Sequence, residues 1–460
     1  MTDPLLPGVS ISDGPADWQI IQQGADGTAD IALAGAYRVD AAQFAVELRL
    51  VRERDGTPVS DRLDWQAVDM LPGDRWQGVL RGVPAGGLYR VECRATRPGH
   101  GDPRPTRGDY VHHLGVGDIW VIAGQSNSSG TGLGAVDDPP TLGVHLFGND
   151  EQWKLAAHPL EDATRTLHPI TVHGVFQAHA PWLAFGRVLQ ETLGYPIGLI
   201  PTALGGSPLS MWEPAQRGLL YTNMMQMIRA AGGAVRGMVW CQGESDAIGL
   251  QTGTYLDRFA AFLATWREEM GAELPVLTAQ LSRYTVPVGD EVAASWTALR
   301  EVQRQAARHV PGVGLVPTVD LPMSDEVHIS AVGNVVMGRR FAAAALRYVY
   351  GRDEPAPGVR LVGVAWQSAQ PPVLRVTFAP PLGGWRKVPR VRDFTVSDAD
   401  GPVPVMAAEA LDDGWVDLEL GRATVGEVTV TNHAGCDPVA DLRDMDQRPT
   451  EGFTVALPPA

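Results

Sequence analysis

The stretch "DIWVIAGQSNSSG", residues 118–130, joins a short apolar run to a bend that is rich in glycine and polar residues. An apolar run of this length that ends in glycine is typical of a buried strand followed by a turn. Ser126 stands directly after the run, where its hydroxyl could be exposed between a strand and a helix. Gly-Gln-Ser-Asn is also ordinary turn chemistry, so the stretch alone leaves a nucleophile and a turn residue as alternatives.

Similar apolar runs recur from about Val116 to Tyr350, and segments with helical periodicity alternate with them. Strands that alternate with helices predict a parallel sheet covered by helices on both faces. The predicted strands lie in 118–124, 196–206, 235–243, 274–281 and 313–321, and the predicted helices in 181–194, 218–233, 254–271, 295–309 and 330–351.

The flanking segments have the shorter period of β-strands. Apolar and polar residues alternate from about Asp17 to Arg97, as in "FAVELRLVRE" (44–53), and again after "GRDEPAPG" (351–358). Each flank therefore predicts a β-sandwich. The expected organisation is an N-terminal β-sandwich at 1–115, an α/β domain at 116–350 and a C-terminal β-sandwich at 351–460.

The composition argues against several classes of protein. A net charge of -16 would repel nucleic acid and anionic lipid, so we expect neither as a partner. Cys93, Cys241 and Cys436 lie far apart, and no cluster has the spacing of metal ligands, so we expect no disulfide framework, metal or cofactor. The first residues lack an export signal, which predicts a cytoplasmic protein. The sequence does not predict the oligomeric state.

Four polar segments follow predicted strands: "GQSN" (124–127), "GGS" (205–207), "CQGESD" (241–246) and "SDEVH" (324–328). Because the carboxyl ends of parallel strands share one edge of a sheet, we expect these segments to lie close together, where ligands bind. The edge would then bring a serine, a histidine, carboxylates and an amide into one site.

A serine nucleophile needs a base to take its proton and a group that orients the base. His328 follows Asp325 by three residues, a spacing that lets the carboxylate reach one ring nitrogen while the other faces Ser126. A solvated acidic loop with an incidental histidine is the alternative interpretation. We read the other histidines as structural or surface residues.

The nucleophile also needs hydrogen-bond donors for the oxyanion. Gly206 can bring its backbone N–H close to a bound oxyanion, and Gln242 offers a side-chain amide. Glu244 and Asp246 accompany Gln242, and a helix-capping role is the alternative for these two acids.

The ordered motifs "GDIWVIAGQSN", "PIGLIPTALGGSPLSMWEP", "VWCQGESDA" and "SDEVHISAVGN" resemble the SGNH hydrolase superfamily, in particular sialate O-acetylesterase-like carbohydrate esterases. The resemblance implies a flavodoxin-like three-layer α/β domain. It implies these roles: Ser126 as nucleophile, His328 as general base, Asp325 as its partner, the Ser126 and Gly206 amides with the Gln242 side chain as oxyanion hole, and Glu244 and Asn127 as supporting residues.

The family resemblance implies a serine esterase that removes O-acetyl groups from sialic acid or an acetylated oligosaccharide through an acetyl-enzyme. The competing hypothesis is a catalytically silent carbohydrate-binding or scaffolding protein, because a fold does not decide function. Trp212 is a candidate for stacking on a sugar ring, and a core position is the alternative. Ser128 and Ser129 stand where relatives commonly have a bulky residue, which predicts a more open or more polar acyl pocket.

Overall fold

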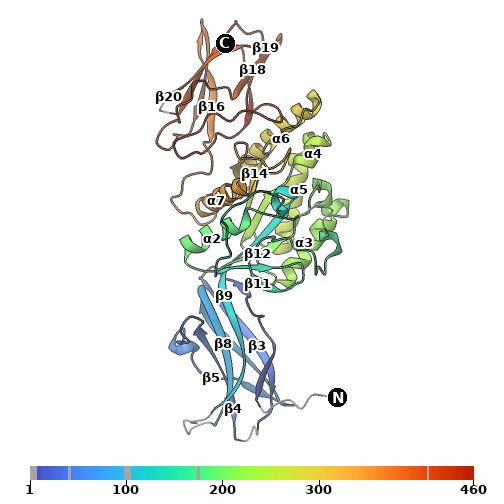
Figure 1. The fold of residues 1–460 in the computed structure, drawn as a ribbon, viewed down its shortest axis with the longest axis vertical. Helices are drawn as coiled ribbons and strands as arrows, with labels where there is room; N and C mark the ends of the chain where they lie inside the picture. The colour runs from blue at the N-terminus through green and yellow to red at the C-terminus, as the bar shows by residue number, and fades with distance from the viewer. Residues whose placement is uncertain (1–7, 40–42, 98–104, 173–176, 412–413) are drawn as a thin grey trace.

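The computed structural model describes residues 8–39, 43–97, 105–172, 177–411 and 414–460. The chain forms three regions that follow one another along the long axis of the molecule (Figure 1). An N-terminal β region lies at one end, a central α/β region in the middle and a C-terminal β region at the other end. Among the described residues, no helix is both long enough and apolar enough to cross a membrane.

The N-terminal β region is built from mostly antiparallel strands around one apolar core. Its elements are β1 (Val9–Asp13), β2 (Ile20–Gln22), β3 (Thr28–Tyr37), β4 (Ala45–Arg52), η1 (Asp61–Leu63), β5 (Gln66–Ala67), β6 (Asp69–Leu71), β7 (Arg75–Pro84) and β8 (Gly86–Thr96). One sheet has the order β1-β3-β7-β6, while β4 pairs with β5 and β8. Val46, Leu48 and Leu50 of β4 point into the core, as the alternation in 44–53 predicts.

Charged side chains on β4 and β8 are paired across the strands. Arg49 lies 2.7 Å from Glu92, and Arg94 lies 2.7 Å from Glu47.

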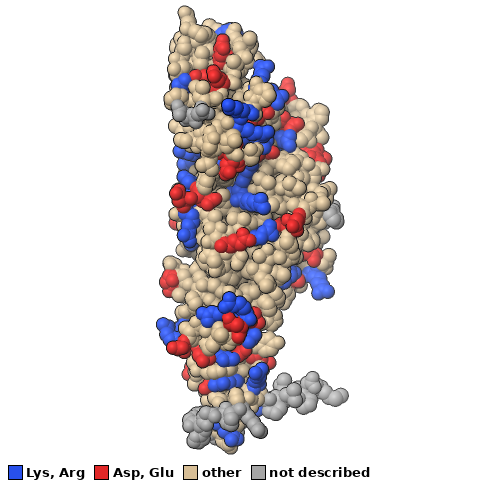
Figure 2. Space-filling model, turned by 60° about the vertical axis from the view of Figure 1, so that its left-hand side comes forward, with Lys and Arg blue, Asp and Glu red and all other residues tan. Residues whose placement is uncertain are grey.

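On the face shown in Figure 2, basic side chains lie among acidic ones in each of the three regions. Acidic side chains beside basic ones offset part of their charge.

A single strand connects the N-terminal and central regions. The strand β9 (Thr106–Gly124) has 19 residues and pairs antiparallel with β8 in its first part, up to Gly86↔Val116. Its second part pairs in parallel with β12 and β13 of the central sheet. The boundary predicted between 115 and 116 therefore falls inside a continuous hydrogen-bonded strand and not in a linker.

The central region contains the predicted parallel sheet. Its strands are β10 (Val144–Phe147), β11 (Trp153–Leu155), β12 (Ile197–Pro201), β13 (Gly237–Cys241), β14 (Val276–Gln280) and β15 (Val313–Pro317). Its helices are α1 (Ser126–Ser129), η2 (Pro169–Thr171), α2 (Trp182–Leu193), η3 (Leu209–Met211), η4 (Pro214–Gln216), α3 (Leu219–Ala230), α4 (Glu244–Ile248), η5 (Thr252–Thr254), α5 (Tyr255–Met270), α6 (Asp290–His309) and α7 (Ala331–Tyr348). The strand order is β11-β10-β12-β9-β13-β14-β15, and only β11 is antiparallel to its neighbour.

Helices cover both faces of this sheet. Ile119 and Val121 of β9 pack in a core with α3, α5 and α6, whereas Trp120 and Ile122 pack in a second core with α2 and α7. Successive residues of a strand point to opposite faces, so an almost continuous apolar run supplies both cores. The mixed α/β fold predicted from the sequence is confirmed.

Two details differ from the predicted elements. The strands β10 and β11 were missed because they are only four and three residues long, and β10 includes His145. Of the two, β11 lies at the edge of the sheet. The helix α6 begins at Asp290, five residues before the predicted start, with Asp290 and Glu291 in its first turn. Acidic residues are favourable there because the amino end of a helix carries partial positive charge.

The C-terminal β region has two antiparallel sheets that share one core. Its strands are β16 (Leu361–Ala369), β17 (Pro372–Phe378), β18 (Phe394–Asp398), β19 (Gly401–Val403), β20 (Val405–Leu411), β21 (Trp415–Leu420), β22 (Val428–Asn432) and β23 (Phe453–Leu457). The sheet orders are β16-β17-β21-β20 and β19-β18-β22-β23. In Figure 1, β9 rises from the N-terminal region, so the carboxyl ends of the parallel strands point toward the C-terminal region.

Candidate active site

The four polar segments follow the ends of neighbouring parallel strands. Gly124 at the end of β9 pairs with Cys241 at the end of β13, and Gln280 at the end of β14 pairs with Pro317 at the end of β15. The segment with Gly206 follows β12, which ends at Pro201. The structure thus places the predicted segments at one edge of the sheet.

The backbone turns sharply before Ser126. Gly124 has a φ of +121°, and a Cβ there would lie 2.1 Å from the Cys241 carbonyl oxygen, so only glycine fits. The Gln125 amide donates to Cys241 (2.8 Å), and α1 begins at Ser126. Ser126 is 6% exposed, and its hydroxyl donates no hydrogen bond to any other residue that the structure describes.

The ring of His328 is held by Asp325. Its Nδ1 lies 2.7 Å from Oδ2 of Asp325, while Oδ1 accepts hydrogen bonds from the amides of Val327 (2.9 Å) and His328 (2.7 Å). Partial burial alone would raise the pKa of Asp325, but these hydrogen bonds outweigh it and leave the pKa below the ordinary 3.8. Asp325 is thus a carboxylate at neutral pH that orients the ring and leaves Nε2 to exchange a proton.

Asn127 joins the serine segment to the histidine loop. Its Nδ2 donates to the Val327 carbonyl (3.2 Å), and its Oδ1 accepts from the Ile329 amide (3.0 Å). These two contacts flank His328 on both sides. The residue directly after Ser126 therefore fixes the backbone that carries His328.

Glu244 contacts the side-chain amide group of Asn127. Its side chain is buried, and Oε1 accepts a hydrogen bond from Asn127 Nδ2 at 2.8 Å. Its Oε2 has no hydrogen-bond partner among the described residues. Burial raises the pKa of Glu244, and the Asn127 hydrogen bond and the nearby His328 offset this only in part. Of the two acids, Asp325 binds the ring directly, and Glu244 reaches the histidine loop through Asn127.

Two backbone amides are available at the edge. Gly206 has a φ of +70° and is exposed, and a Cβ there would meet no atom within 4 Å. Neither the Gly206 nor the Ser126 amide donates a hydrogen bond within the part of the chain that the structure describes. Both can serve as oxyanion donors, as the sequence predicts.

The side chain of Gln242 is already occupied. Its Nε2 donates to Asp246 (2.6 Å) and to the Ser207 carbonyl (3.2 Å), and its Oε1 accepts from Tyr255 (2.7 Å). The side chain is 2% exposed. An amide has only two hydrogens, so Gln242 has no free donor for an oxyanion. The structure corrects that prediction, because Asp246, four residues away, and the Ser207 carbonyl, 35 residues away, satisfy the amide.

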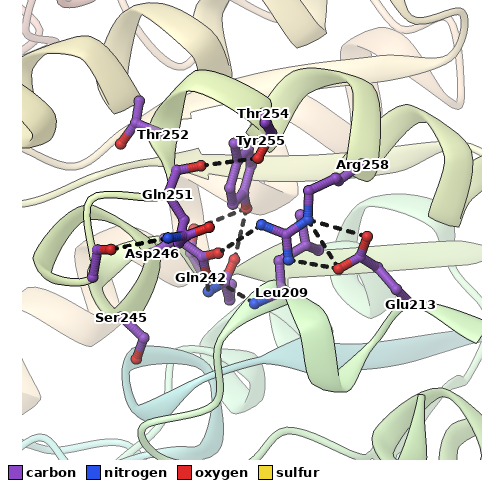
Figure 3. A network of polar contacts seen from close by, with 12 residues as sticks. Leu209, Glu213, Gln242, Ser245, Asp246, Gln251, Thr252, Thr254, Tyr255 and Arg258 are labelled. Atoms are coloured by element: carbon purple, nitrogen blue, oxygen red, sulfur yellow. Dashed lines mark hydrogen bonds and ion pairs between the residues drawn. The ribbon is translucent and has the colours of Figure 1, made fainter. Parts of the chain in front are cut away.

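A polar network extends from Gln242 through Asp246 to Arg258 (Figure 3). Asp246 also accepts from the Leu209 amide (2.8 Å), and Arg258 lies 3.4 Å from Asp246. The same guanidinium group binds Glu213, which follows η3 in the chain, through Nε at 3.0 Å. The sequence analysis missed Arg258. Its partner Glu213 lies 45 residues earlier in the chain, and no local sequence pattern reveals such a contact.

Two further predictions need correction. Trp212 is 0% exposed and packs edge-on against Trp240, so it belongs to the core and cannot stack on a sugar. Ser128 and Ser129 are buried, and their hydroxyls donate to the carbonyls of Ala123 and Ser126. These hydroxyls do not line an acyl pocket, because they turn toward the backbone of β9 and α1.

Among the described residues, Asp138, His158 and His179 form a group that could hold a metal ion, with ligand atoms within 4.8 Å of one another. Nε2 of His158 (3.0 Å) and of His179 (3.1 Å) both contact Oδ2 of Asp138, and Arg187 binds the other oxygen. Nδ1 of His158 accepts the Ala180 amide (3.4 Å), so Nε2 carries the ring proton. These hydrogen bonds explain why the three side chains lie together: they surround the buried Asp138 carboxylate, which is paired with Arg187.

A parallel sheet whose edge brings together a serine, glycine amides and a histidine–aspartate pair is the arrangement of carbohydrate esterases of the SGNH type. Residues 116–347 match the family described as "Carbohydrate esterase, sialic acid-specific acetylesterase". The match takes in half of the chain, so the protein belongs to this family. The resemblance seen in the sequence is confirmed.

Individual relatives agree with this assignment. Human sialate O-acetylesterase is 28% identical over 233 residues, which are 42% of this chain and 43% of the human protein. The chain thus matches less than half the length of that relative. A probable carbohydrate esterase from Arabidopsis thaliana is 25% identical over 253 residues, covering 50% of this chain and 90% of the plant protein. A carbohydrate acetylesterase from Xanthomonas citri shares the fold, with a TM-score of 0.65, 21% identity and coverage of 96% of this chain and 98% of that chain.

Proposed function

We propose that this protein is a serine esterase that removes O-acetyl groups from carbohydrates. The observation that carries the proposal is the Asn127 bridge. It ties the segment of Ser126 to the backbone on both sides of His328, whose ring is bonded to Asp325 at 2.7 Å. A nucleophile, a base and an orienting acid are the parts that acyl transfer to serine requires.

The reaction proceeds in two halves. In the first, Ser126 Oγ bonds to the acetyl carbonyl carbon as His328 Nε2 takes the hydroxyl proton, and the ester bond to the sugar oxygen then breaks. His328 returns the proton to the departing sugar oxygen. In the second half, water attacks the acetyl-enzyme with the same proton transfers and releases acetate.

The amides of Ser126 and Gly206 stabilise the oxyanion in this scheme. Gln242 acts indirectly, because its hydrogen bond to the Ser207 carbonyl (3.2 Å) holds the residue next to Gly206. Backbone donors that are fixed before the reaction stabilise the developing charge most effectively. A role in positioning thus replaces the donor role that the sequence predicts for Gln242.

Acetylated sialic acid and acetylated oligosaccharides are the proposed substrate class, in view of what the named relatives act on. We further propose that the flanking regions are two β-sandwich domains and that the chain divides at about 115 and 350. The two sheets around one core at residues 361–457 support the C-terminal assignment.

Hydrolysis of p-nitrophenyl acetate, followed by a screen of acetylated sugars for acetate release, tests the proposal. Ser126→Ala and His328→Ala should each abolish turnover, whereas Ser397→Ala, on β18 of the C-terminal region, should not. A wild-type protein that hydrolyses none of these esters would favour the silent carbohydrate-binding protein instead.

A further inference from the structure

The loop that carries Asp325 and His328 runs from residue 318 to 328, and is called the histidine loop below. Asn127 holds its far end, beside Val327. The rest of the loop needs other support, because an exposed loop would not keep a catalytic ring in place. Part of that support comes from the central region, where Thr318 bonds to Gln280 and Ser282, and part comes from the C-terminal β region.

The first contact is made at Asp320, near the start of the histidine loop. Its buried carboxylate binds Arg340 of α7 at 2.6 Å and Arg443 of the C-terminal region at 3.3 Å. Arg340 also donates to the carbonyl of Gln447, at 3.1 Å. Arg443 and Gln447 lie in the same C-terminal segment, so one ion-pair cluster links that segment to the loop.

The second contact passes through residues 283–285, which follow β14. Arg283 donates to the Leu321 carbonyl in the histidine loop (3.2 Å) and lies 3.2 Å from Asp437 of the C-terminal region. The Tyr284 amide donates to the Cys436 carbonyl (2.9 Å), and the Thr285 amide donates to the Glu326 carbonyl (2.8 Å). This segment therefore touches the C-terminal region on one side and the histidine loop on the other.

Arg300 of α6 contacts both the segment after β14 and the C-terminal region. Its side chain is fully buried and donates to the carbonyls of Leu281, Ser282, His433, Gly435 and Cys436. Burial lowers the pKa of Arg300 to about 9. A buried cation is tolerated only where its donors are satisfied, so these carbonyls must stay in place around the guanidinium. The C-terminal region is thus fixed to the end of β14 and is not loosely tethered.

We infer that the C-terminal β region is part of the esterase site, because residues 433–447 hold the histidine loop in register with Ser126. Arg283 is the positioning residue that joins the two. The inference rests on the proposed function. A displacement of about 1 Å in a catalytic group costs about 10²-fold in rate, so a loosened loop should lower kcat more than it raises KM.

The test compares Arg283→Met with Arg375→Met. Arg375 also forms an ion pair within the C-terminal region, with Asp417 at 2.7 Å, and both residues lie outside 433–447, on β17 and β21. Arg283→Met should lower kcat about 10- to 100-fold and slow labelling of Ser126 by a fluorophosphonate by a similar factor. Amide exchange should rise in 320–328 but not in α5. Arg375→Met should change none of these.

Arg283→Lys keeps the charge beside Asp437 and should recover part of the rate. Asp437→Asn, at a side chain that is 47% exposed, is a milder variant that should raise exchange in 320–328 without affecting folding. Wild-type kcat and unchanged exchange in Arg283→Met would overturn the inference. If the wild-type protein shows neither hydrolysis nor labelling, the proposed function fails. The exchange measurement still decides whether the C-terminal region holds the loop.

Discussion

Replacing Asp325 by Asn tests which acid orients His328. Asn can keep its oxygen toward the amides of Val327 and His328, which bind Oδ1 of the native side chain at 2.9 and 2.7 Å. Its NH₂ group then faces Nδ1, which must become an acceptor, and the ring proton moves to Nε2. This tautomer cannot take the proton of Ser126. In a well-studied serine protease, the equivalent change costs about 10⁴ in kcat.

The loss should be somewhat smaller here. The Asp325 side chain is 33% exposed, so water can partly replace the carboxylate. We expect Asp325→Asn to lower kcat about 10²- to 10⁴-fold, which corresponds to about 3 to 5 kcal/mol of transition-state stabilisation. Glu244→Gln should cost no more than about tenfold, because a glutamine oxygen can still accept the hydrogen bond from Asn127.

Steady-state kinetics with p-nitrophenyl acetate measures both losses, and thermal melts confirm that the variants fold. If both acids serve the same ring, the double variant should lose less than the product of the single losses. A larger loss from Glu244→Gln than from Asp325→Asn would refute the assignment and make Glu244 the principal partner.

Three other results are expected. Burial raises the pKa of Glu161 from the ordinary 4.5 to about 8, so the folded protein favours the neutral acid. Its contribution to stability is complete below pH 4.5 and is lost as the pH rises through about 8, so Glu161→Gln should flatten the pH dependence of thermal melts over that range. A melting temperature that is unchanged over this range in the wild-type protein would contradict this. Chelation should leave ester hydrolysis unchanged, and loss of activity restored by zinc would point to Asp138, His158 and His179. Acetyl esters should react faster than butyryl esters, as competing p-nitrophenyl substrates can show, and a rise in kcat/KM with chain length would argue for a different substrate class.

The features that follow local rules could be predicted from the sequence. Alternating and helical periodicities predicted the parallel sheet, because burial of a strand or a helix face fixes its apolar pattern. The bond between Asp325 and His328 also follows from three-residue spacing within one loop.

Contacts between distant segments could not be predicted in this way. The Asn127 bridge spans about 200 residues, and the Ser207 carbonyl that occupies Gln242 follows a different strand, 35 residues away. Trp212 shows the same limit, because a tryptophan after a glycine turn fits a rim or a core equally well, and only packing against Trp240 decides between them. The continuity of β9 through position 115 depends on partners in two regions.

The central claim is that Ser126 forms the acetyl-enzyme with His328 as its base. Rapid acid quench during turnover of p-nitrophenyl acetate, followed by peptide mass spectrometry, tests it directly. The account predicts the added mass of one acetyl group on the peptide that contains Ser126, and no such adduct in His328→Ala. An acetyl group trapped on another residue, or full turnover by Ser126→Ala, would contradict it.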